Sequence, residues 1–165
     1  MDSGRSAGAC NERVDAYCGL YCGACDVLQA NLRGTVEKLA AEWKMTADEL
    51  LCHGCRTEVA AVFCRDCTFR ACARRKGLEF CAECADYPCE ALVAFRNDKH
   101  PHHSIVLHNL ERISTVGGPA WREEQRARWS CPACGEPFTW YADGCPSCGK
   151  PVPNAIQEER ELGLS

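Results

Sequence analysis

Six C-x2-C pairs dominate this sequence and limit the ways in which it can fold. Twelve of the sixteen cysteines lie in these pairs, and cysteine makes up about a tenth of the 165 residues. Without the cysteines, the hydrophobic share falls from 46% to roughly 36%, below the usual share of about 45–50%. A chain so poor in large apolar side chains needs cross-links or bound metals in addition to an apolar core.

The cellular compartment decides whether such cysteines form disulfides or bind metal. The first ten residues, MDSGRSAGAC, contain no apolar run typical of a secretory signal, and no stretch is apolar enough to span a membrane. We therefore predict a cytoplasmic protein whose thiols stay reduced. A disulfide framework is the alternative, favoured only if the chain is cut from a longer precursor. The net charge of −4, without a long basic tract, argues against general nucleic-acid binding.

The most specific pattern is C-x2-C-x10-C-x2-C near the C-terminal end, formed by Cys131, Cys134, Cys145 and Cys148. A glycine follows each pair, Gly135 and Gly149, where the backbone can turn its N–H groups toward the thiolates. Closed tetrahedral ligation of zinc suits four such cysteines. We predict a zinc ribbon over residues 130–152, with Phe138, Trp140 and Tyr141 on a β-hairpin between the two pairs.

A second set of eleven cysteines lies between residues 18 and 89: Cys18, Cys22, Cys25, Cys52, Cys55, Cys64, Cys67, Cys72, Cys81, Cys84 and Cys89. Within it, residues 64–72 and 81–89 share the pattern C-x2-C-x4-C. We predict that all eleven are metal ligands. Our hypothesis for their grouping is two closed sites, one formed by Cys52, Cys55, Cys64 and Cys67 and the other by Cys72, Cys81, Cys84 and Cys89.

This grouping leaves over the C-x3-C-x2-C motif of Cys18, Cys22 and Cys25. A further ligand would complete a third site, and the candidates are Cys10, His53 and a histidine-rich turn with His100, His102 and His103. Alternatively, one or more cysteines are small buried apolar residues. His102 and His103 are adjacent, which favours surface or capping roles over paired ligation.

The spacings do not distinguish zinc from an iron–sulfur cluster such as [4Fe-4S] in residues 18–89. A basic stretch after Cys64 would offset the negative charge of thiolates around either metal: Arg65, Arg70, Arg74, Arg75 and Lys76. A solvated charged face is the plainer interpretation of that stretch.

Outside the cysteines, we expect a mainly α-helical protein with irregular cysteine-rich loops. Apolar spacing predicts helices from Asp26 to Gly34 and through 36–43, and TADELL (46–51) carries the capping-box signature of a short helix. Further helices are expected over 88–96, 104–114 and 119–129. We predict a disordered tail (1–14), a cysteine-rich metal-binding domain (15–98), a helical spacer (99–129), the ribbon (130–152) and a polar tail (153–165).

Four stretches together resemble a prokaryotic family catalogued as domain of unknown function 3795: AYCGLYCGACDVLQA (16–30), AAEWKM (40–45), CHGCR (52–56) and FCRDCTFRACARRKGLEFCAECADYPCEAL (63–92). The resemblance covers about residues 15–96, and KGLEFCAECADYPCE (76–90) is its most distinctive part. It implies a small bacterial or archaeal cysteine-rich protein that binds metal. It implies no activity, because the family is uncharacterised, and it does not cover the spacer or the ribbon.

These observations favour a cytoplasmic zinc-stabilised module. We expect its partner to be another protein and not a nucleic acid, because Glu136 and Asp143 beside Lys150 leave the ribbon without a basic face. The alternative is an iron–sulfur electron carrier or redox sensor. A third hypothesis is an enzyme with an open metal site at Cys18, Cys22 and Cys25. The motif suits radical chemistry with S-adenosylmethionine, or thiol exchange through Cys22 and Cys25, but the strand–helix frames of those enzymes are not visible. We identify no catalytic residues.

Overall fold

The structure is a computed structural model that describes residues 13–164, and its regular structure is helical. Cys10 and almost all of the predicted tail (1–14) lie outside the described residues. The α-helices are α1 (Asp26–Arg33), α2 (Val36–Trp43), α3 (Val62–Arg65), α4 (Thr68–Lys76), α5 (Glu90–Arg96), α6 (Val106–Val116), α7 (Gly118–Arg128) and α8 (Ala155–Glu161). Residues 13–164 also contain three short 3-10 helices, η1 (Cys22–Ala24), η2 (Cys81–Glu83) and η3 (Pro101–His103). The structure is mainly helical, but the predicted fold class is wrong in its C-terminal β-hairpin, as described below.

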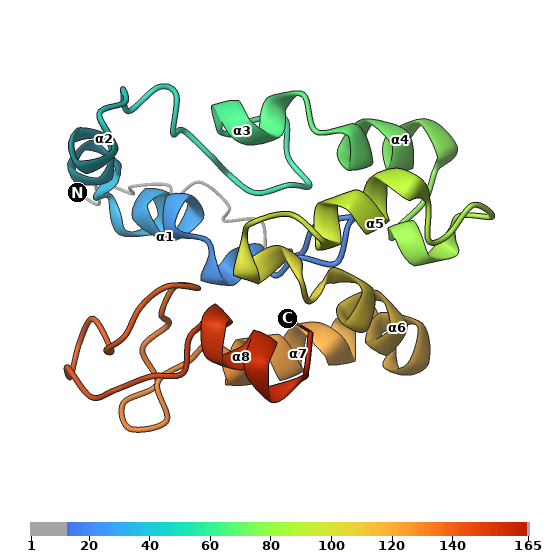
Figure 1. Ribbon diagram of the computed structural model, residues 1–165. Coiled ribbons are helices and arrows are strands. Elements are labelled where there is room, and N and C mark those ends of the chain that lie inside the picture. The colour runs from blue at the N-terminus through green and yellow to red at the C-terminus, as the bar shows by residue number, and fades with distance from the viewer. Residues whose placement is uncertain (1–12, 165) are drawn as a thin grey trace, which may run out of the picture.

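The helices form two groups on either side of the segment that precedes α1. In Figure 1, α2 to α5 lie in the upper half and α6 to α8 in the lower half, with the blue segment before α1 between them. None of the helices in residues 13–164 is both long and apolar enough to cross a membrane.

The predicted helices at 26–34 and 36–43 are present as α1 and α2, and the capping box at Thr46 also forms. The Thr46 N–H donates to the Glu49 carboxylate (2.8 Å), and the Glu49 N–H donates to the Thr46 hydroxyl (3.3 Å). The prediction of a short helix after this capping box is nevertheless wrong, because residues 47–50 form only a turn. The carbonyl of Glu49 accepts its hydrogen bond from Val62, and the N–H of His53 donates to Val59, so neither group continues a helix.

The larger hydrophobic core joins segments that are far apart in the sequence. It includes Ala16, Tyr21, Phe80, Leu92, Val106, Leu110, Trp121, Trp129, Phe138, Trp140, Val152 and Ala155. Members come from the predicted cysteine-rich domain, spacer, ribbon and C-terminal tail, and the tail contains α8. The domain boundaries stay predictions, while the core extends across all four segments.

The turn at Gly19 allows α6 to pack directly on the segment that carries Cys18. Gly19 has a φ of 89°, and a Cβ at this position would lie 2.9 Å from both the Leu110 Cγ and the Val106 carbonyl oxygen. The Asn109 side chain donates a hydrogen bond of 2.8 Å to the Gly19 carbonyl. Any side chain at this position would therefore push α6 away from the core.

Asp15 is completely buried and is neutralised by arginines from three segments. Its carboxylate lies 2.8 Å from both Arg13 and Arg56 and 3.5 Å from Arg122 on α7. Burial alone would raise the pKa of Asp15, but the hydrogen bond from Arg13 and the charge of Arg56 outweigh burial and lower it. The network ties the first turn, the cysteine loop around residue 56, and α7 together.

The predicted β-hairpin between the C-terminal cysteine pairs is wrong. The described residues contain no β-strand, only three isolated bridges, two of which join Ser130 to Pro137 and Gly144 to Pro151. The backbone of Trp140 bonds outside the predicted hairpin: its N–H donates to Ala24 (2.9 Å), and its carbonyl accepts from Ala155 (2.7 Å). The segment between the pairs thus pairs with η1 and α8 instead of with itself.

We expect Asp15→Ala to destabilise the protein by about 3–5 kcal/mol, because the substitution leaves Arg56, whose side chain is only 8% exposed, without its buried counter-charge. Urea unfolding of the metal-loaded protein measures this effect. Since the pKa of Asp15 is lowered on folding, the stabilising contribution is present above about pH 4 and is lost as the pH falls through the folded-state pKa.

Glu124→Ala is the matched control. It removes a carboxylate from an exposed pair with Arg112 at 2.6 Å, and because solvent screens that pair it should cost far less stability than Asp15→Ala. Equal losses in the two variants would contradict a structural role for the buried network.

Candidate metal centres

The four C-terminal cysteines converge on one point. The Sγ atoms of Cys131 and Cys148 are 3.7 Å apart and those of Cys134 and Cys145 are 3.4 Å apart. All four sulfur atoms lie within 4.8 Å of one another. Zinc–sulfur bonds of about 2.3 Å in a tetrahedron place the sulfur atoms about 3.8 Å apart. These cysteines could therefore hold one metal ion without rearrangement.

The site is built from two copies of one turn. The sequence CPACGEP (131–137) recurs as CPSCGKP (145–151), a repeat of C-P-x-C-G-x-P that also marks both turns in the sequence. In the first copy, the Cys131 N–H donates to Glu136 and the Gly135 N–H to Cys131; in the second, Cys145 donates to Lys150 and Gly149 to Cys145. The bridge between Ser130 and Pro137 closes the first turn, and the bridge between Gly144 and Pro151 closes the second. The β-type pairing in this region therefore lies within each turn and not between the two turns, where it was predicted.

Backbone donors favour the thiolate form of Cys145. The N–H groups of Ser147 and Cys148 lie 3.4 Å and 3.5 Å from its Sγ atom. The pKa of the Cys145 thiol is lowered to about 6, with the Cys148 N–H as the largest contribution and with the Ser147 N–H and the thiols of Cys134 and Cys131 adding to it. A deprotonated cysteine is the form that binds a metal ion.

The N-terminal cysteines lie at the starts of helices and in the loop between α2 and α3. Cys25, Cys67 and Cys89 are the N-cap residues of α1, α4 and α5, and Cys22 and Cys81 begin η1 and η2. Cys52 and Cys55 lie in the loop, Cys64 on α3 and Cys72 on α4. Cys18 occupies the turn against α6, and Cys84 follows η2.

Cys18, Cys22 and Cys25 influence one another and several further N-terminal thiols electrostatically. Cys22 and Cys25 pack against both hydrophobic clusters of the protein, and buried Cys52 belongs to the smaller one. Burial raises the pKa of Cys18 and Cys22 well above the usual value and that of Cys25 to about 12. The nearby thiols that act on them include Cys52, Cys55, Cys64 and Cys67.

The remaining four thiols are Cys81 and three that act on it. Burial raises the pKa of Cys81 to about 12, and the next contributions come from Cys89, Cys72 and Cys84. In residues 13–164, however, only the C-terminal set brings three or more metal-binding side chains within 4.8 Å of one another. The ligand grouping predicted for the eleven N-terminal cysteines therefore stays a prediction.

The basic stretch after Cys64 is largely bound to neighbouring backbone and carboxylates. Arg65 donates to the carbonyls of Ala60 and Asp48. Arg70 donates to the Thr57 carbonyl, and Arg74 pairs with Glu58 at 2.8 Å. These three arginines hold the cysteine loop against α3 and α4, a role that the local sequence does not reveal.

The histidine-rich turn packs on aromatic rings. His102 stacks on Trp140 with ring centroids 4.1 Å apart, and its Nδ1 lies 2.6 Å from the Tyr141 hydroxyl. Burial lowers the pKa of His102 to about 3, so the ring is neutral. His103 stacks on Phe95 and contacts Asp98 at 2.7 Å. Neither these histidines nor His53 joins the group of ligands described above for residues 13–164.

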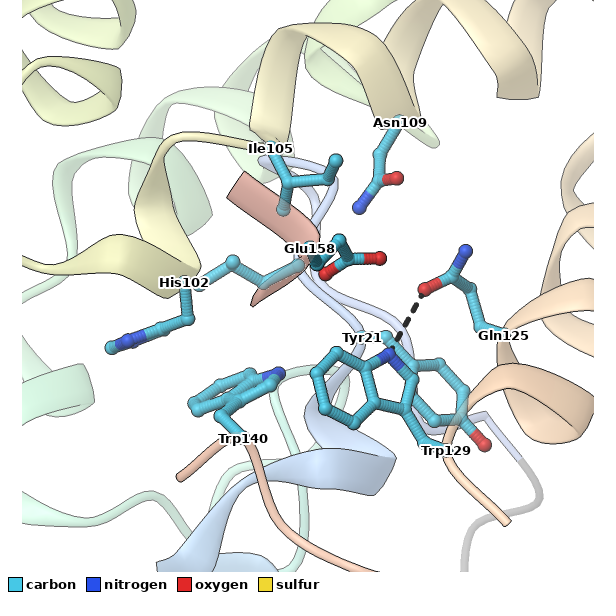
Figure 2. Close-up of a pocket in the computed structure, with 9 residues that line it drawn as sticks. Tyr21, His102, Ile105, Asn109, Gln125, Trp129, Trp140 and Glu158 are labelled. Carbon is cyan, nitrogen blue, oxygen red and sulfur yellow. Dashed lines mark hydrogen bonds between the residues drawn. The ribbon is translucent and has the colours of Figure 1, made fainter. Parts of the chain in front are cut away.

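His102 also borders a small cavity of about 10 Å³, which has room for one water molecule. Figure 2 shows the Glu158 carboxylate among the lining side chains, with the Trp129 indole donating to Gln125. Burial raises the pKa of Glu158, and Arg128 lies 3.5 Å from it. This cavity is too small for an organic substrate.

Comparison with known proteins identifies only the N-terminal half. The model of the family described as "Protein of unknown function (DUF3795)" matches residues 14–94. No curated protein and no solved structure matches the chain.

We expect Gly135→Ala and Gly149→Ala each to cost about 1–2 kcal/mol, because their φ values of 78° and 72° lie in the left-handed region. No atom lies within 4 Å of a Cβ at either position, so steric overlap adds nothing. Urea unfolding of the metal-loaded variants measures the loss. Ser147→Ala, which keeps the backbone donor to Cys145, is the control, and an unchanged stability in both glycine variants would rule out backbone strain at the turns.

Proposed function

Residues 14–94 belong to the DUF3795 family of proteins of unknown function, and from the C-terminal site beside them we propose a zinc-stabilised protein that binds another protein. The observation that carries the zinc assignment is the sulfur spacing of 3.4 Å and 3.7 Å, close to an edge of a zinc–thiolate tetrahedron. Four thiolates leave no open coordination position, so the zinc would be structural.

The position of the thiols supports a structural role. Cys131 and Cys145 are buried in the larger core with Trp129 and Phe138, whereas Cys134 and Cys148 are exposed. Structural zinc contributes about 10–16 kcal/mol of apparent binding free energy, comparable to or larger than the stability of a typical domain, about 5–15 kcal/mol. Zinc at this site would therefore stabilise the core that joins α6, α7 and the first turn.

The protein partner is supported by an exposed aromatic pair on α2 and α3. Trp43 and Phe63 are 43% and 59% exposed, and their rings meet edge to face with centroids 6.3 Å apart. Exposed Leu51 and Val62 lie close to them in the sequence. Aromatic side chains are enriched at protein–protein interfaces.

We expect Cys131→Ser and Cys145→Ser each to lose one equivalent of zinc per chain relative to the parent. Elemental analysis of purified protein measures the zinc, and circular dichroism with tryptophan fluorescence follows the fold. Strong chelation should unfold the protein cooperatively, because Trp129 and Trp140 share the core with the thiols.

Ser147→Ala is again the control and should keep the parent zinc content. A Cys131→Ser variant with the full zinc content would refute the site. An unchanged circular dichroism spectrum after verified zinc removal would refute its stabilising role.

A further inference from the structure

The cysteines around η2 form a second set whose arrangement differs from the C-terminal one. Cys81 begins η2, Cys84 follows it, Cys72 lies on α4, and Cys89 caps α5. The Cys81 N–H donates to the Tyr17 carbonyl (2.8 Å), which fixes η2 beside the core. Phe69 and Phe95 pack with ring centroids 5.1 Å apart and bring α4 and α5 together.

Cationic side chains lie directly outside this set of thiols. The Lys76 ammonium donates to the Cys84 Sγ atom at 3.1 Å and to the Asp86 carboxylate at 3.0 Å. The Arg75 guanidinium lies 3.9 Å from the Cys72 Sγ atom. A cation so close to a thiol favours the thiolate and offsets the negative charge of a metal–thiolate centre.

The spacing of the thiols distinguishes the two sets. The C-terminal thiols meet at the distances of ligands to one ion, whereas no three of the thiols of Cys72, Cys81, Cys84 and Cys89 lie within 4.8 Å of one another. Thiolates of a polynuclear cluster each bind a different iron atom, and therefore stand farther apart than ligands of a single ion. An iron–sulfur cluster also requires thiolate ligands, which this set supplies.

We propose that Cys72, Cys81, Cys84 and Cys89 bind an iron–sulfur cluster, and that Lys76 is the cation that tunes it from outside through Cys84. The proposal does not depend on zinc at the C-terminal site. The reduced cluster carries one more negative charge than the oxidised cluster, and the positive charge of Lys76 stabilises it. Lys76 therefore raises the reduction potential of the cluster.

The first test counts metals in the full-length protein purified without oxygen. We expect iron and acid-labile sulfide in the parent, and a loss of both in the same proportion in Cys81→Ser and Cys89→Ser, with zinc unchanged. Cys131→Ser is the matched control: it should lose zinc and, in protein whose circular dichroism shows the parent fold, keep iron and sulfide. This control separates failure of the zinc site from failure of the cluster.

Zinc without iron or labile sulfide in the parent would overturn the proposal, and so would a Cys81→Ser variant with the full iron and sulfide content. Should Cys81→Ser fail to fold, the parent analysis and the Lys76 variants below decide the question.

The second test addresses Lys76 in the folded, loaded protein. Dithionite donates one electron to the cluster, and a redox titration followed by absorbance gives the midpoint potential. We expect Lys76→Met to keep the parent iron and sulfide content and to shift the potential to a more negative value. Lys38→Met, which removes the same charge from α2, should leave the potential unchanged, and an unshifted potential in Lys76→Met would overturn the role of Lys76.

Discussion

Thiols and apolar side chains share one core in this protein, and the rest of the structure depends on that arrangement. Cys18, Cys131 and Cys145 are buried among Tyr21, Trp129 and Phe138. A thiolate in such surroundings is costly unless a cation compensates its charge. The described core therefore needs either protonated thiols or a bound metal, and metal binding would be coupled to the packing of the whole chain.

The C-terminal site could be predicted from the sequence because its geometry is local. Each turn of C-P-x-C-G-x-P places two thiols through hydrogen bonds within seven residues, and Gly135 and Gly149 supply the left-handed backbone. The spacing of Cys131, Cys134, Cys145 and Cys148 therefore identifies the group correctly. The predicted hairpin failed because the intervening Trp140 bonds to Ala24 and Ala155, distant partners that no local pattern contains.

Helices α1 and α2 were likewise predictable, because their signals are local: apolar residues recur at helical spacing in both, and Gly34 ends α1. The capping box of Thr46 and Glu49 was predictable too, but the helix after it was not, because Val62 takes the Glu49 carbonyl. The buried pairing of Asp15 with Arg56 leaves no signal in the sequence, because it joins residues 41 positions apart. The N-terminal thiols come from several elements, so their C-x2-C spacing cannot fix their partners.

The C-terminal module and the N-terminal thiols are also mechanically linked. The Trp140 N–H donates to the carbonyl of Ala24, the residue immediately before Cys25. Arg33, at the end of α1, donates to the Pro137 carbonyl in the first C-terminal turn (2.7 Å). The module thus holds both the start and the end of the helix that Cys25 caps. A metal bound by the C-terminal turns would therefore order the segment that carries the thiols of Cys22 and Cys25.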